Sequence, residues 1–79
     1  MIFTYSLISE TIWLDSKPNM VYGIAVTYEV DGVLMQRTIN DITTDRAKLE
    51  HLIELCNNQK LDICHLDDVV EDFLNFQKH

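Results

Sequence analysis

The sequence predicts an α+β fold in which a three-stranded antiparallel meander is followed by two α-helices packed on one face of the sheet (βββαα). Three observations predict it. Apolar and polar side chains alternate through residues 20–30, an Asp-Gly pair follows at 31–32, and the apolar spacing lengthens after Asn40. Alternation is typical of a half-buried strand, and a spacing of about 3.6 residues is typical of an amphipathic helix. With 79 residues, of which 47% are hydrophobic, we expect residues 1–79 to form a single domain with one thin core.

The first strand is predicted over residues 2–14, which are rich in β-branched and aromatic side chains. The apolar parity shifts part-way along this segment, and a shift of that kind predicts a bulge near Ser9 or Glu10. Residues 15–19 contain Asp, Ser, Pro and Asn, so they are expected to form the connection to the next strand.

The second and third strands are predicted over residues 20–30 and 33–40, joined by the two-residue turn Asp31-Gly32. An Asp-Gly pair suits a type I′ turn, whose twist matches that of the flanking strands. The turn fixes the register, and the shared face is apolar except for Arg37. The predicted cross-strand pairs are Val30 with Val33, Tyr28 with Met35, Val26 with Arg37, and Ile24 with Ile39.

Two helices are predicted over residues 44–57 and 63–77, each with an apolar stripe that faces the sheet. Asp62 is a candidate N-cap for the second helix, because a carboxylate there can accept a bond from a free backbone N–H. The candidate end signals of the first helix are Thr43 or Thr44 as the N-cap, Asp45 in the first turn, and Asn57 with Asn58 as a left-handed stop.

Composition excludes several classes of protein. The 13 acidic residues outnumber the 6 basic ones, giving a net charge of −7, so the chain is not expected to bind nucleic acid. Its apolar runs end well before the roughly 20 residues of a membrane span, and no signal peptide is recognised, so we expect a cytoplasmic protein with reduced cysteines.

The outer face of the second helix is acidic, and this face is the first candidate binding surface. It carries like-charged pairs one turn apart, which cost helix stability unless a cation or a basic protein partner neutralises them. The alternative is a face that is only solvated. The candidate partner-binding residues are Asp67, Asp68, Glu71 and Asp72.

A sheet edge is the second candidate surface. The first and third strands of a meander both present unpaired backbone groups, which can accept another strand. Homodimerisation, or pairing with a strand of another protein, is therefore a second form of partnership that the sequence predicts.

Cys56, Cys64 and His65 are the candidate metal ligands, because thiolates and imidazole suit zinc. Their spacing does not match the short zinc-binding pairs, and a fourth ligand would have to come from His51 or His79. Cys56 also lies on the apolar stripe of the first helix, where a thiol behaves as a small hydrophobic group. A buried structural cysteine is therefore favoured over a metal ligand, and no cofactor is expected.

Four segments together carry a resemblance: Tyr22-Gly23-Ile24, residues 41–46, Leu55-Cys56-Asn57 and residues 65–74. In these segments, over about the last two-thirds of the chain, it resembles a small family of short, acidic Gram-positive bacterial proteins of unknown function. The family's second helix opens with Ser-Pro, where this chain has Asp62-Ile63, so the proline that pre-organises the first turn is missing. The resemblance implies a bacterial cytoplasmic protein and transfers no activity or ligand.

Taken together, these features predict a non-enzymatic domain that binds another protein through the acidic helix face or a sheet edge. The alternative is a small metal-binding protein that uses Cys56, Cys64 and His65. Catalysis is not expected, because His51 and His65 have no recognisable nucleophile or orienting carboxylate beside them in the sequence.

Overall fold

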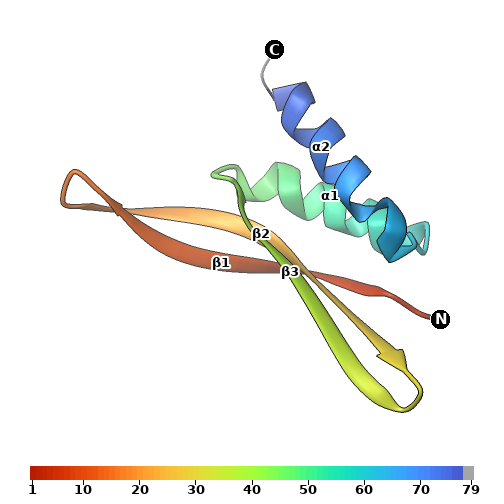
Figure 1. Ribbon diagram of the computed structural model, residues 1–79. Helices are drawn as coiled ribbons and strands as arrows, with labels where there is room; N and C mark the ends of the chain where they lie inside the picture. The colour runs from red at the N-terminus through yellow and green to blue at the C-terminus, as the bar shows by residue number, and fades with distance from the viewer. Residues whose placement is uncertain (78–79) are drawn as a thin grey trace.

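The computed structural model describes residues 1–77, with side chains to residue 75. It confirms the α+β fold: three antiparallel strands in the order β1-β2-β3 are followed by two helices, with both helices on one face of the sheet (Figure 1). The elements are β1 (Thr4–Leu14), β2 (Lys17–Val30), β3 (Val33–Thr43), α1 (Arg46–Asn58), the 3-10 helix η1 (Ile63–His65) and α2 (Leu66–Gln77).

The sheet consists of two long hairpins that overlap only in part. β1 pairs with β2 from Thr4 opposite Thr27 to the tight turn after Leu14, whereas β3 pairs with the other end of β2, from Val30 inwards. Each hairpin therefore ends in a two-stranded ribbon that projects beyond the helices (Figure 1). The radius of gyration is 13.6 Å, against about 12 Å for a compact domain of this length.

Both hairpin turns contain two residues with positive φ, as type I′ turns require. At Asp31 and Gly32 the φ angles are 51° and 81°, and all four predicted pairs between β2 and β3 are present. The first turn is tighter than predicted, because Asp15 and Ser16 alone form it, with φ angles of 52° and 62°. β2 consequently begins at Lys17 rather than at residue 20.

The bulge predicted on β1 is wrong. β1 pairs with β2 without interruption, including at Ser9 and Glu10. The irregularity lies instead between β2 and β3, where the register shifts between Tyr22 and Ile24 and Asp41 takes a left-handed φ of 54°. The apolar parity of β1 changes because Ile8 and Ile12, which are half-buried, share the sheet face opposite the helices with the buried Val21.

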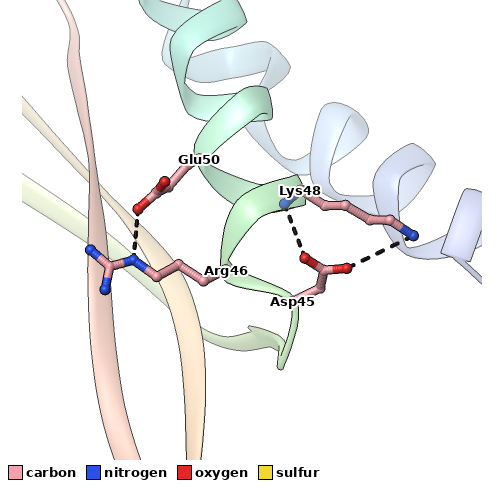
Figure 2. Close-up of polar contacts among 4 residues, drawn as sticks. All are labelled: Asp45, Arg46, Lys48 and Glu50. Carbon is pink, nitrogen blue, oxygen red and sulfur yellow. Dashed lines mark hydrogen bonds and ion pairs between the residues drawn. The ribbon is translucent and has the colours of Figure 1, made fainter.

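α1 begins at Arg46, one or two residues later than the predicted caps Thr44 and Thr43 imply. Asp45 is the N-cap: its backbone is extended and its Oδ1 accepts from the Lys48 N–H at 3.1 Å (Figure 2). Thr43 still belongs to β3, and its hydroxyl accepts from the Asp45 N–H at 3.0 Å. The predictions of Thr43 or Thr44 as the N-cap, and of Asp45 in the first turn, are therefore wrong, because β3 continues further than the sequence pattern indicates.

α1 ends at a Schellman motif whose left-handed residue is Lys60, with a φ of 53°. The Leu61 N–H donates to the carbonyl of Cys56 at 3.0 Å, and the Lys60 N–H donates to that of Asn57 at 3.2 Å. The left-handed stop predicted at Asn57 and Asn58 is therefore wrong. Asp62 is an N-cap as predicted, since its Oδ1 accepts from the Cys64 N–H at 3.0 Å. It caps η1, however, and α2 begins at Leu66 rather than at residue 63.

The core lies between the two helices and the central, three-stranded part of the sheet. Five of its side chains have 2% or less of their surface exposed and come from strands and helices alike, which fixes both helices to the same sheet face. The buried cluster comprises Tyr5, Ile24, Val26, Ile42, Leu49, Ile53, Cys56, Leu66 and Val70.

Candidate functional site: a strand edge and an acidic helix face

The free edge of β1 is closed at Tyr5 by the side chain of Asn57, from the last turn of α1. The Tyr5 N–H donates to Asn57 Oδ1 at 2.8 Å, and Asn57 Nδ2 donates to the Tyr5 carbonyl at 2.9 Å. The amide thus makes the pair of bonds that a neighbouring strand would make. An added strand cannot run along β1 past this point.

The Tyr5 side chain ties the same region to the loop after α1. Its ring is buried, and its hydroxyl donates to the Leu61 carbonyl at 2.7 Å. Burial, with smaller contributions from Cys56, Asp62 and Cys64, raises the pKa of Tyr5 to about 12. The neutral phenol is therefore the form that the fold stabilises.

We expect the stability of the domain to fall as the pH rises from about 10 to about 12. The pKa of Tyr5 is 10.0 in the unfolded chain and about 12 in the folded chain. Between these two pH values the unfolded chain releases the proton while the folded chain keeps it. The folded state is therefore favoured below pH 10 and loses that advantage above it. Urea unfolding across this range tests the prediction: Tyr5→Phe should flatten the fall, and an equally steep fall in the variant would contradict it.

The edge of β3, on the other side of the sheet, is open. In an antiparallel ladder, alternate residues bond to the neighbouring strand, and Met35 and Arg37 lie in the bonded positions set by the two-residue turn. The backbone groups of Leu34, Gln36 and Thr38 therefore point away from β2. Within residues 1–77 no hydrogen bond occupies them.

The ribbon end formed by β2 and β3 exposes apolar side chains on both faces. Val33 is 58% exposed on the helix side and Leu34 is 73% exposed on the opposite side, with Val30 and Met35 also exposed. An open hollow of about 590 Å³ lies beside this end, lined in part by Met1. Residues 33–38 are all exposed, so this stretch of edge is accessible to another chain.

The other ribbon end also exposes apolar groups. Trp13 is 68% exposed, and Leu14 and Met20 lie exposed beside it. Trp13 pairs with Pro18, which has no backbone N–H to offer on its side of the ribbon. This end is a second apolar surface, although the edge of β2 lacks one backbone donor there, at Pro18.

The four predicted partner-binding residues lie exposed on α2. Asp67 is already engaged: its Oδ1 lies 2.7 Å from Arg37 Nη2, which ties α2 to β3 and accounts for the one charge on the apolar face of the sheet. Asp67 and Asp68 also lie in the first turn, where negative charge complements the helix dipole. Part of the acidic cluster therefore has a structural role, and Glu71 and Asp72 extend it along the helix.

The structure does not assemble the candidate metal site. Cys56 is buried and burial raises its thiol pKa, whereas Cys64 is exposed and its pKa is raised mainly by its hydrogen bond with Asp62. Among the described residues, no three His, Cys, Asp or Glu side chains are grouped to hold a metal ion. The remaining candidate ligand from the sequence, His79, lies outside the described residues.

The fold and its surfaces define a small two-layer α+β domain whose β1 edge is closed at Tyr5 and whose β3 edge is open along residues 33–38. The chain belongs to DUF6514, a family of unknown function, whose model matches residues 1–75. The match includes the strands as well as the C-terminal segments in which the resemblance is visible. No curated protein and no solved structure matches the chain. In the described part of the chain, no helix is long and apolar enough to cross a membrane.

Proposed function

We propose that the chain is a non-enzymatic protein–protein interaction domain that takes up an extended segment of its partner along β3. The observation that carries the proposal is the difference between the two sheet edges. β1 is closed at Tyr5 by Asn57, whereas residues 33–38 of β3 are exposed and three of them direct backbone groups outward. Strand addition of this kind uses main-chain bonds for affinity and alternate side chains for specificity.

The side chains along β3 favour an apolar partner segment. Val33 and Met35 lie on one face and Leu34 on the other, so an added strand would cover exposed apolar surface on both of its sides. Arg37 is the one charged side chain in this stretch, and it already pairs with Asp67. Affinity would therefore depend little on salt.

The acidic face of α2 is the second candidate surface. It is favoured by the exposure of Asp68, Glu71 and Asp72, which take part in no ion pair within the described side chains. A basic partner would bind there, and salt would weaken its binding because exposed charges are screened.

Proline at position 36 discriminates between the two surfaces. The Gln36 N–H points away from β2, so Gln36→Pro removes an outward donor and leaves the bonds between β2 and β3 intact. Gln36→Ala is the matched control, because it removes the side chain but keeps the donor. Tagged wild-type protein and both variants are used to capture partners from a lysate of the source cells, with folding checked by circular dichroism.

The proposal predicts that a partner captured by the wild type and by Gln36→Ala is lost with Gln36→Pro. The combined variant Asp68→Asn, Glu71→Gln and Asp72→Asn should still capture it. Capture that survives Gln36→Pro and fails with the α2 variant would assign binding to the acidic face instead.

A further inference from the structure

The open stretch of β3 has definite ends. The turn at Asp31 and Gly32 closes it on one side, and the irregularity at Asp41 ends the regular ladder on the other. A bulge of this kind re-aims the strand and terminates pairing. Residues 33–39 remain as the free edge.

This stretch is suited to pairing with itself. Its midpoint is Gln36, and Gln36 is one of the residues whose N–H and C=O point outward. A two-fold axis through a hydrogen-bonded pair of identical antiparallel strands requires a residue that directs both groups at its own counterpart. Centring on Gln36 meets that requirement and uses the whole of residues 33–39, giving about six main-chain bonds.

The neighbouring registers are less favourable. A two-fold axis at Arg37 would set two guanidinium groups directly opposite one another, which is destabilising. An axis at Met35 would carry the pairing beyond residue 33 into the turn at Asp31 and Gly32, and so would shorten the overlap. Only the register centred on Gln36 avoids both costs.

The side chains that this register places opposite each other are compatible. Val33 of one copy meets Ile39 of the other, which is half-buried at the border of the core, so an exposed apolar group gains an apolar neighbour. Arg37 lies opposite Met35, whose flexible chain can cover the stem of the arginine. Residues 33–39 contain no acidic side chain, so this stretch is locally free of the repulsion expected between two chains of charge −7.

We propose that the segment taken up by β3 is β3 of a second copy of this chain, in the antiparallel register centred on Gln36. The result is a six-stranded sheet with the helices of both copies on the same face. This inference rests on the proposed function of the β3 edge and names its partner.

Charge pairs at position 36 test both the partner and the register. Because residue 36 faces its own counterpart, Gln36→Lys and Gln36→Glu should each weaken the dimer about tenfold or more, since like charges meet on the axis. Mixing the two variants should restore dimers, because each lysine then faces a glutamate. Sedimentation equilibrium over about 10 to 500 µM covers the affinity expected of a single strand edge.

The matched controls are Asn58→Lys and Asn58→Glu, which change the net charge equally at an exposed position on α1. They should dimerise as the wild type does. A dimer whose affinity is unchanged by both substitutions at position 36, but which dissociates with Trp13→Ser, would overturn the inference. It would assign the contact to the other ribbon end.

The outcomes also separate this inference from the proposed function. A wild-type chain that stays monomeric throughout, yet loses a captured partner with Gln36→Pro, would overturn the second copy as the partner and leave the β3 edge as the binding surface. A dimer that is unaffected by Gln36→Pro would overturn the inference, and partner capture that is equally unaffected would overturn the proposed function.

Discussion

Replacing Gly23 by alanine is expected to destabilise the domain by about 3 kcal/mol, near the upper range for steric overpacking. Gly23 lies in the middle of β2, where β3 bulges toward it. A β-carbon at this position would collide with the main-chain oxygen of Ile39 and would lie 3.0 Å from the Cα of Asn40. Both obstacles are backbone atoms, so no side-chain rotation can relieve the contact. Urea unfolding of Gly23→Ala measures the loss.

Gly32 provides the control for Gly23, because it is a glycine of the same hairpin that is required by its backbone conformation and not by a close contact. It needs a positive φ of 81°, but a β-carbon there would have open space around it. Gly32→Asn should cost little, since asparagine tolerates the left-handed conformation. If Gly23→Ala lowers the free energy of unfolding no more than Gly32→Asn does, that result would contradict the close approach of β2 and β3 at the bulge.

Asn57→Ala is expected to destabilise the domain by about 2 kcal/mol, because it leaves two part-buried backbone groups of Tyr5 without their partners. Asn58→Ala is the matched control: its side chain is exposed in the same helical turn, and it should change stability by less than about 0.5 kcal/mol. Thermal and urea unfolding of both variants measure the difference.

Asn57→Asp separates the two bonds. A carboxylate still accepts from the Tyr5 N–H but cannot donate to the Tyr5 carbonyl, so its effect should fall between those of the wild type and of Asn57→Ala. Equal stability of Asn57→Ala and Asn58→Ala would contradict the role assigned to the Asn57 amide.

The sequence predicted the sheet well where local chemistry decides the structure. The turn at Asp31 and Gly32, together with the alternation in residues 20–30, determined the register of β2 and β3, because a two-residue turn leaves one pairing. The prediction failed where a local helix-capping preference competes with the pairing of the preceding strand. The N-cap moved to Asp45 because β3 continues to Thr43, and no pattern within the helix signals how far the preceding strand extends.

The site was predicted only in outline. Strand edges and the acidic face of α2 were both visible as candidates, but nothing in the sequence ranked them. The residue that distinguishes the two strand edges is Asn57, which the sequence predicts as a helix stop and whose partner Tyr5 lies 52 positions away. Likewise, the pairing of Arg37 with Asp67 spans 30 positions and becomes visible only when α2 is placed beside β3.

Amide hydrogen exchange along the two edge strands tests the central claim, that β1 is closed at Tyr5 while β3 is open, most directly. In dilute protein the Tyr5 amide should be protected by Asn57, and along β3 the amides of Met35 and Arg37 should be protected while that of Gln36 exchanges freely. On concentration, the Gln36 amide should become protected. Uniform protection along β3 at all concentrations, or free exchange at Tyr5, would contradict the account.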